Sequence, residues 1–392
     1  MQWKRGTAVL WWLAVAVVVT VGALLPWLWD HTGADLKVYR LGGWTMLTDP
    51  PALYDARLPH IAMPFTYPVF GALVMIPFAV LTWPLAYAAS IVASGVALTA
   101  IWRLCLRSFT AKPHPPVLVM LVAASLLLEP VRETLSYGQI NLILCAVILY
   151  DLLDGKHKHR GLWIGIAAGI KLTPLVFLGL LLVTRQRRAL ANAAATFLGT
   201  VVLGFLVAPG TALHYWTHLL GETTRIGGLA YAGNQSWNGF LIRRSGDLAG
   251  GGPVWLVLVV LTTGAGLWLS RMLWLRGQRL AAASVCGLIS LFCSPVSWSH
   301  HWVWTLPCGI ALARVLDGRA RIVVASAWYA AFVVAPIWWP PRSNNRELDW
   351  SFGQQVAGNA YLWLTLAGAL VLAAGCRRRT RLKVGNYHER IS

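Results

Sequence analysis

The first apolar stretch of the chain, residues 8–29, reads AVLWWLAVAVVVTVGALLPWLW and indicates the class of the fold. A helix needs about 20 such residues to cross the roughly 30 Å of hydrocarbon in a bilayer. Basic residues precede the stretch, and Trp27 and Trp29 end it where a signal peptide would have a small-residue cleavage site. We therefore predict a retained first span, with its N-terminus in the cytoplasm and the two tryptophans at the outer interface.

Similar apolar stretches recur to the end of the chain, whose residues are 57% hydrophobic and 12% charged. Charged residues make up about 25% of a soluble domain, so an ordinary soluble globule is excluded. The stretches also lack the short alternating pattern of a transmembrane β-barrel. The sequence predicts an all-α polytopic membrane protein in which residues 1–392 form a single domain, without a soluble domain or a linker.

We expect about twelve membrane segments, joined by loops of unequal length. After the first, they cover residues 66–82, 84–106, 116–130, 139–154, 161–184, 189–208, 252–275, 280–297, 302–317, 321–339 and 357–376. The polar parts are a long first outer loop (30–64), a second large outer loop (209–251) and a basic cytoplasmic tail (377–392). Long loops rich in polar and aromatic groups usually carry function.

The net charge of +19 is distributed over short basic clusters at the ends of apolar segments. The clusters include residues 156–160, 185–188, 314–321 and 377–383. This positive-inside pattern favours the cytoplasm for these loops and argues against a nucleic-acid partner. We expect the partners of the basic tail to be membrane lipids with anionic headgroups.

Segment 161–184 carries a charge and a helix breaker near its centre, Lys171 and Pro174. This interruption predicts two half-helices that meet at a polar point, which only surrounding protein or water makes tolerable. The clusters at 156–160 and 185–188 could then both be cytoplasmic, so the topology of residues 66–184 stays open. We expect Lys171 to face a polar cavity, because a cation facing lipid would cost at least ~2.5 kcal/mol.

Polar and aromatic side chains gather in the first outer loop and in four later clusters. The candidate site residues are Asp35, Tyr39, Tyr67, Glu129, Arg132, Gln139, Asn141, Lys171, Asn234, Gln235, His300 and His301. Structural alternatives stay open for them: amides that bond neighbouring helices, a buried ion pair, turn chemistry, or an exposed loop carboxylate. The six cysteines form no C-x-x-C pair and are expected to be packing residues.

The adjacent histidines, His300 and His301, point in different directions on a helix, so we expect no two-ligand metal site there. For the same reason only one of them should face the cavity, preferably His300. Together the candidate groups suit an extended polar ligand with an anionic group and a lipid tail, such as a sugar phosphate on a polyprenol. Amides and aromatic rings would bind the sugar, Lys or His the phosphate, and a carboxylate would remove a proton. No metal or other cofactor is required.

Five blocks resemble, in order, the pattern of glycosyltransferase family 87. They are DLKVY (35–39) with LY (53–54) and PFTYP (64–68), GQIN (138–141), GIKLTP (169–174), GNQS (233–236) and SPVSWSHHW (294–302). The resemblance implies a GT-C-type bundle and an inverting transferase that uses polyprenyl-phosphate sugars. It also implies a catalytic aspartate in the first outer loop, a position that Asp35 matches. The family often reads Tyr-Pro-Pro where this chain has Tyr67-Pro68-Val69, which puts only the local turn in doubt.

Members of the family build envelope glycolipids. Residues 298–302 look most like the corresponding stretch of the members that add mannose to phosphatidylinositol mannosides. The resemblance then implies α-(1→2) transfer of the fifth mannose from polyprenyl-phosphate-mannose to a glycolipid acceptor, at the extracytoplasmic (periplasmic) face of the cell membrane. Branching mannosyltransferases of lipomannan and α-(1→3)-arabinofuranosyltransferases of the same family remain alternatives. A lipid-linked-sugar flippase or transporter is the alternative from another class, although the inverted repeats typical of transporters are not evident.

In the implied mechanism Asp35 removes the proton of an acceptor hydroxyl that attacks a β-linked mannosyl phosphate, which gives an α-mannoside. One carboxylate suffices because a phosphate leaving group needs no protonation, unlike the leaving group in a glycoside hydrolase. Lys171, His300 or His301 would stabilise the departing phosphate. We expect Asp35, near the interface, to be ionised without a large pKa shift. Asp30, which is closer to the first span, is the alternative candidate for the proton acceptor.

Overall fold

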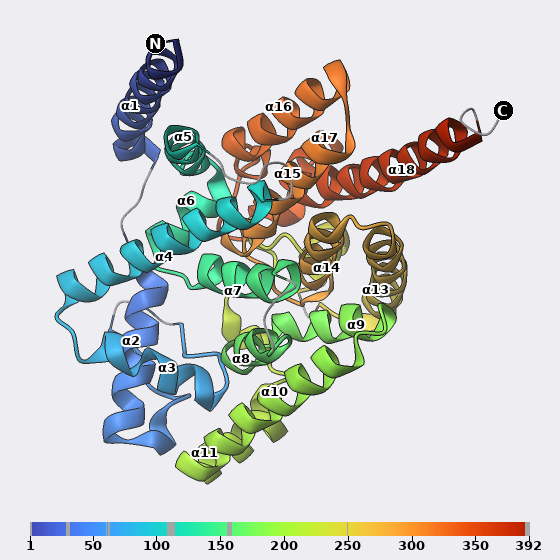
Figure 1. Cartoon of the computed structure of the whole chain (residues 1–392). Helices are drawn as coiled ribbons and strands as arrows, with labels where there is room; N and C mark the ends of the chain where they lie inside the picture. The colour runs from blue at the N-terminus through green and yellow to red at the C-terminus, as the bar shows by residue number, and fades with distance from the viewer. Residues whose placement is uncertain are drawn as a thin grey trace.

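The computed structural model describes residues 2–28, 32–59, 61, 63–107, 114–154, 159–248 and 250–388. Within these residues the regular structure is helical, apart from isolated bridges between Leu58 and Ile61 and between Asn234 and Trp298. The all-α expectation is therefore confirmed (Figure 1).

The helices vary widely in length. The α-helices are α1 (Gln2–Leu28), α2 (Ala34–Thr48), α3 (Val69–Ala79), α4 (Trp83–Leu106), α5 (Pro115–Ser125), α6 (Glu129–Tyr137), α7 (Asn141–Leu153), α8 (Leu162–Ile170), α9 (Val176–Val183), α10 (Arg187–Val207), α11 (Pro209–His214), α12 (Trp237–Ser245), α13 (Gly252–Leu275), α14 (Arg279–Cys293), α15 (Thr305–Val315), α16 (Gly318–Val334), α17 (Phe352–Gly358) and α18 (Ala360–His388). Shorter 3-10 or π turns are η1 (Pro50–Ala52), η2 (Thr173–Leu175), η3 (Tyr215–Leu219), η4 (Thr223–Ile226), η5 (Ser299–Trp304), η6 (Pro336–Trp338) and η7 (Arg346–Asp349).

Several of these helices are long and apolar enough to cross a membrane. Among the described residues there are 4 such helices, Trp83–Leu106, Arg187–Val207, Gly252–Leu275 and Gly318–Trp338. Two bent pairs, α5 with α6 (77°) and α17 with α18 (67°), raise the number to 6 if each pair is one span. The chain is thus a multi-pass membrane protein, but the expected number of twelve segments is not confirmed. Apolar length alone set that number, whereas breaks leave helices such as α3 and α7 shorter than the about 20 residues of a full span.

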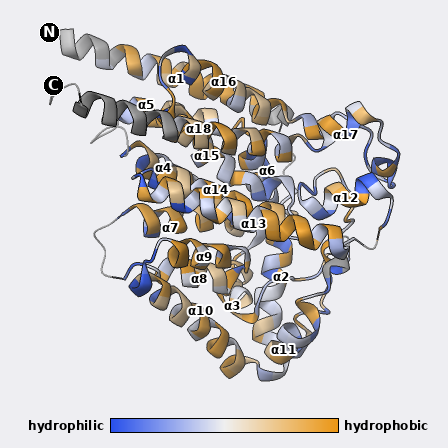
Figure 2. Ribbon diagram, turned by 90° about the vertical axis from the view of Figure 1, so that its right-hand side faces the viewer, coloured by the Kyte–Doolittle hydropathy of each residue, from blue (hydrophilic) through white to orange (hydrophobic). Residues whose placement is uncertain are grey.

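Segment 161–184 is broken as expected, with Lys171 in an extended conformation between α8 and η2. The two ends of this segment lie close to the same part of α13. The Arg160 guanidinium stacks over the Trp274 ring at 5.4 Å, and Arg271 donates a hydrogen bond to the Val183 carbonyl at 3.0 Å. The half-helices therefore turn back instead of crossing in a straight line, which brings Arg160 near the basic start of α10. Figure 2 shows that start on the same side of the bundle as the hydrophilic end of α4.

The stretch 30–64, expected to form the first outer loop, contains helix α2. Two glycines allow α2 to pack closely on its neighbours, Gly43 on α3 and Gly42 on the segment that precedes α3. A Cβ atom at Gly43 would lie 2.8 Å from the Met75 carbonyl oxygen, and one at Gly42 would lie 2.6 Å from the Phe65 ring. Gly33, in the left-handed region with a φ of 54°, precedes α2, and its amide donates to the Ser136 carbonyl at 2.8 Å. These contacts hold the first turn of α2, and with it Asp35, against α6.

The described interior is largely apolar, and its cysteines form no disulfide, with Cys293 partly exposed and the other five buried. Buried polar side chains occur at Gln139, Asn141, Lys171 and His300. Some expectations fall on residues outside the described part: Trp29, Asp30, the basic residues 156–158 and the chain end, 389–392. The side chains of Trp27 and of residues 377–388 are also not described, so lipid contacts of the tail stay a prediction.

Candidate functional site

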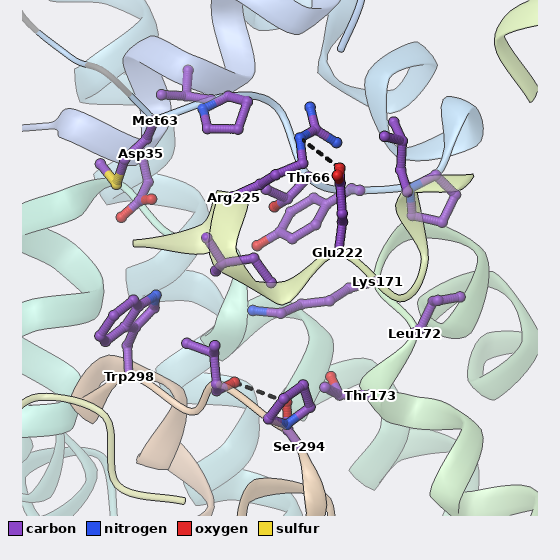
Figure 3. A pocket seen from close by; sticks show the side chains of 18 of the residues that line it. Asp35, Met63, Thr66, Lys171, Leu172, Thr173, Glu222, Arg225, Ser294 and Trp298 are labelled. Atoms are coloured by element: carbon purple, nitrogen blue, oxygen red, sulfur yellow. Dashed lines mark hydrogen bonds and ion pairs between the residues drawn. The ribbon is translucent and has the colours of Figure 1, made fainter. Parts of the chain in front are cut away.

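A cavity of about 290 Å³ brings together six parts of the chain: the start of α2, residues 63–68, Gln139, the break after α8, the segment after α11 and the segment from Ser294 to His301. We call it the cationic cavity, because Lys171 and Arg225 line it beside Asp35, Tyr67, Gln139, Glu222, Trp298 and His301. Figure 3 shows Asp35, Lys171 and Arg225 on different walls of this cavity. The broken segment thus supplies its cation to a polar space, and the expected position of Lys171 is confirmed.

Asp35 lies in the first turn of α2 with its carboxylate partly exposed to the cavity. Desolvation in the cavity wall raises the pKa of Asp35 to about 6, although a hydrogen bond from Gln139 and the charge of Lys171 act in the opposite direction. The expectation of an ionised carboxylate without a large pKa shift was therefore wrong, because Asp35 is enclosed by helices and does not stand free at the interface. A pKa near neutrality suits a general base.

Gln139 orients the Asp35 carboxylate. Its Oε1 accepts hydrogen bonds from the hydroxyls of Tyr39 at 2.6 Å and Tyr67 at 3.4 Å, and these two hydroxyls are 2.7 Å apart. Because both tyrosines occupy the carbonyl side of the amide, its NH₂ group is directed at Asp35 and at the His300 ring, whose Nε2 lies 3.3 Å from Nε2 of Gln139. Tyr39, Tyr67 and Gln139 thus form one hydrogen-bonded set beside Asp35.

The Lys171 amine donates a hydrogen bond to Oδ1 of Asn141 at 3.0 Å and lies 5.3 Å from the centre of the Tyr67 ring. Asn141 in turn donates to the His300 carbonyl at 2.9 Å. Amide and aromatic contacts of this kind hold an ammonium group in place without neutralising it. Lys171 can therefore present a positive charge to an anionic ligand in the cavity.

The two histidines face two different cavities. His301 lines the cationic cavity, whereas His300 lines a second cavity of about 240 Å³ that also contains Asp35, Met63, Ile226 and Trp298. Only one histidine lines the cationic cavity, as expected, but it is His301 and not the preferred His300. Asp35 lines both cavities, which therefore adjoin at its carboxylate. Because the side chains of His300 and His301 point in different directions on η5, each of them lines one of the two cavities.

Four candidate residues belong to the supporting structure. Glu129 is fully buried and accepts hydrogen bonds from Trp338 Nε1 at 2.9 Å and from the Tyr361 hydroxyl at 2.6 Å. Arg132 pairs with Glu133 at 3.5 Å. The two bonds of Glu129 tie α6 to η6 and α18, and neither Glu129 nor Arg132 lines either cavity.

Asn234 and Gln235 are likewise fully buried in the second outer loop. Asn234 Nδ2 donates to the Leu229 carbonyl at 2.9 Å, and its Oδ1 accepts the Ser297 amide at 3.0 Å. Gln235 Nε2 donates to the Gly358 carbonyl at 2.7 Å. These bonds hold the loop against the segment before η5 and against the end of α17, and neither side chain lines either of the two cavities.

Sequence reasoning missed Arg225. Its guanidinium lines the cationic cavity, donates to the Tyr54 carbonyl at 2.6 Å and lies 3.8 Å from the Glu222 carboxylate. Arg57 donates to the same carbonyl at 2.8 Å, so two guanidinium groups meet there. A signal existed, because a cation in a loop that is expected to be outer departs from the positive-inside pattern.

The described residues contain no group of three or more His, Cys, Asp or Glu side chains arranged to hold a metal ion. The groups available in and beside the cationic cavity are the Asp35 carboxylate of near-neutral pKa, two cations, the Glu222 carboxylate next to Arg225, and neutral hydrogen-bonding groups. Such a set can take a proton from a hydroxyl and stabilise a leaving anion.

Similarity to known proteins agrees with this chemistry. Residues 65–295 match the profile of glycosyltransferase family 87. The polyprenol-phosphate-mannose-dependent alpha-(1-2)-phosphatidylinositol mannoside mannosyltransferase of Mycobacterium tuberculosis is 32% identical over 405 residues, which cover 97% of this chain and 93% of the relative. Its counterpart in Mycolicibacterium smegmatis is 32% identical over 383 residues, which cover 91% and 86%.

A second M. smegmatis relative, a polyprenol-phosphate-mannose-dependent alpha-(1-2)-phosphatidylinositol pentamannoside mannosyltransferase, is 35% identical over 377 residues, which cover 90% of this chain and 88% of the relative. No solved structure matches the chain significantly. The profile covers more than half of the chain, and these relatives align with nearly all of it. The chain therefore belongs to glycosyltransferase family 87.

Proposed function

We propose that this protein is an inverting mannosyltransferase that moves mannose from polyprenyl-phosphate-mannose to a phosphatidylinositol mannoside and forms an α-(1→2) linkage. The names of its relatives support the donor, the acceptor class and the linkage. The observation that carries the proposal is the position of Asp35, a carboxylate of raised pKa between a cavity with two cations and a second cavity without Lys or Arg among its described lining residues.

In the proposed reaction the donor phosphate lies in the cationic cavity near Lys171 and Arg225. The ionised Asp35 takes the proton from the acceptor hydroxyl, whose oxygen forms a bond to C1 of the mannose. The bond between C1 and the phosphate oxygen breaks at the same time, and its electron pair leaves with the polyprenyl phosphate. Attack from the opposite face inverts a β-linked donor to an α-linked product. The two cations stabilise the charge that develops on the leaving phosphate.

His301 lines the same cavity as Lys171 and can donate a ring N–H to a phosphate oxygen. Gln139 and Tyr39 act indirectly, because their hydrogen bonds set the orientation of the Asp35 carboxylate. The proposed roles thus divide the site into a proton acceptor, a phosphate-binding side and a positioning pair.

We also propose that the active site faces the extracytoplasmic side. Figure 2 shows the start of α10 on the opposite side of the molecule from α11 and α12 of the second large loop, and Arg160 lies near that start, over Trp274 at the end of α13. The positive-inside rule favours the cytoplasm for that basic end. Twelve segments, a single domain over residues 1–392, and the loop boundaries 30–64, 209–251 and 377–392 remain part of this proposal.

The experiment incubates the purified protein with polyprenyl-phosphate-mannose, or with its arabinose counterpart, and a series of phosphatidylinositol mannosides of increasing length. Transfer of mannose alone, to give an α-(1→2) product, is expected. The length of the best acceptor distinguishes the activities of the two kinds of relative. Transfer of arabinose, or movement of the lipid-linked sugar across a vesicle membrane without transfer, would contradict the proposal.

A further inference from the structure

The second cavity, lined by Tyr137, Tyr231, Trp298, Trp338, His300 and Asp35 with three glycines, has a different character from the first. We call it the aromatic cavity. The two cavities share Asp35, Met63, Ile226 and Trp298, so they adjoin at the carboxylate. Lys171 and Arg225 line only the cationic cavity. An anionic phosphate is therefore drawn to one side of Asp35, and a neutral group is favoured on the other.

We propose that the aromatic cavity binds the terminal, reacting sugar of the glycolipid acceptor. This inference rests on the proposed function and adds the place of the second substrate. With the donor phosphate on the cationic side, the acceptor hydroxyl must reach Asp35 from the other side to attack C1 opposite to the leaving group. The aromatic cavity is the described space that opens on that side of the carboxylate.

The aromatic rings suit a pyranose. Tyr231 stands between two indoles, with its ring centre 6.3 Å from that of Trp298 and 5.9 Å from that of Trp338. The C–H groups of a sugar face carry partial positive charge and pack against the negative face of an aromatic ring. The volume of about 240 Å³ is smaller than the about 300 Å³ at which pockets for drug-sized ligands begin, so it fits a single sugar ring and not the whole glycolipid.

These rings are held in place before any ligand arrives. The Trp338 indole donates to Glu129 at 2.9 Å, and the Tyr137 ring packs against His300 at 5.1 Å. The role of Glu129 is therefore to position one wall of the aromatic cavity. Walls fixed in this way reduce the entropy lost on binding.

Glycines keep the cavity open. Gly227, at a φ of +125°, has Trp298 only 3.2 Å from the place of a Cβ atom, and a Cβ at Gly233 would lie 3.0 Å from Tyr231 and 3.2 Å from Trp338. Side chains at these positions would crowd the rings. The loop thus leaves the aromatic faces accessible, while Asp35 and the His300 ring supply polar contacts for hydroxyl groups.

The test uses Tyr231→Ala, with Tyr231→Phe as the conservative variant and Trp339→Ala as the matched control, because Trp339 is 66% exposed and lies outside both cavities. We expect Tyr231→Ala to raise the KM for the phosphatidylinositol mannoside about 5- to 10-fold, the effect of losing one aromatic contact, while the KM for polyprenyl-phosphate-mannose stays unchanged. Tyr231→Phe and the control should behave like the wild type. A raised KM for the donor alone, or no change in either KM, would overturn the inference.

Equilibrium binding of radiolabelled phosphatidylinositol mannoside, measured without donor, separates this inference from the proposed function. We expect Tyr231→Ala to weaken binding by the same factor. If the wild type binds the acceptor but transfers no mannose, the proposed function fails, and the loss of binding in Tyr231→Ala still supports the cavity assignment. Equal binding by the wild type and Tyr231→Ala would overturn the assignment.

Discussion

The hydroxyl of Tyr39 donates a hydrogen bond of 2.6 Å to Oε1 of Gln139, although the two residues are 100 positions apart in the sequence. This bond decides which end of the Gln139 amide faces Asp35. With the carbonyl occupied, the NH₂ group is left to donate to the carboxylate. The basicity of Asp35, the proposed proton acceptor, therefore depends on a contact between Tyr39 of α2 and Gln139, which lies between α6 and α7.

The first prediction concerns Gln139→Leu. Because the hydrogen bond from Gln139 lowers the pKa of Asp35, its loss should raise that pKa above 6. The acidic limb of the pH profile of kcat/KM should then move to higher pH by at least about one unit, as expected for a lost hydrogen bond to a charged group. Tyr39→Phe should give a smaller shift in the same direction. Tyr329→Phe, which removes a hydroxyl bonded to the Ala124 carbonyl, is the control. An acidic limb that stays in place would contradict the role of Gln139.

Asp35→Asn keeps the shape of the side chain and removes its basicity. Transfer should fall by at least ~100-fold, while protein yield and donor binding survive. In the wild type, activity should rise with pH through about 6 and level off above it, because the ionised form is the base. Asp55→Asn changes an exposed carboxylate of the same stretch and should have little effect. If Asp30→Asn abolishes transfer and Asp35→Asn does not, the base is Asp30.

Lys171→Ala should lower activity far more than Lys171→Arg. The alanine variant loses the charge next to the proposed phosphate, whereas arginine retains it. A single-turnover assay with saturating donor measures the effect, and the amount of folded protein is recorded alongside, since the amine also bonds Asn141. Equal losses in the two variants would show that the hydrogen bond, and not the charge, is what matters.

Alanine at both His300 and His301 should reduce turnover, because each ring lines one of the two cavities. The fold should tolerate the change, since Thr134 and Asn141 bond the backbone carbonyl of His300, which alanine keeps. Kinetics of the single variants should separate the roles: His301→Ala is expected to raise the KM for the donor and His300→Ala that for the acceptor. Unchanged turnover in the double variant would remove the pair from the site.

The broken segment shows how much of the architecture is local. Gly169, Lys171 and Pro174 lie within six consecutive residues, 169–174. A charge close to a helix breaker cannot continue an apolar helix, so the half-helices and the polar surroundings of Lys171 were predictable. The number of spans was not. The length of an apolar stretch shows whether a segment is long enough to cross a membrane. It does not predict the bends between α5 and α6 and between α17 and α18, which depend on packing.

The site divides in the same way. The sequence by itself determined a helical membrane protein, a long polar stretch after the first apolar helix, and a set of polar residues too costly to face lipid. Only the tertiary structure decided which of them meet. Glu129 and Asn234 are polar residues of the kind that bind ligands, but they form hydrogen bonds with Trp338 and Ser297 instead. Gln139, in contrast, lies beside Asp35, and Arg225 lines the cationic cavity. Hydropathy is a sum over neighbours in the chain, but the direction of a side chain depends on how each helix is rotated against partners far away in sequence, so no local pattern could give it.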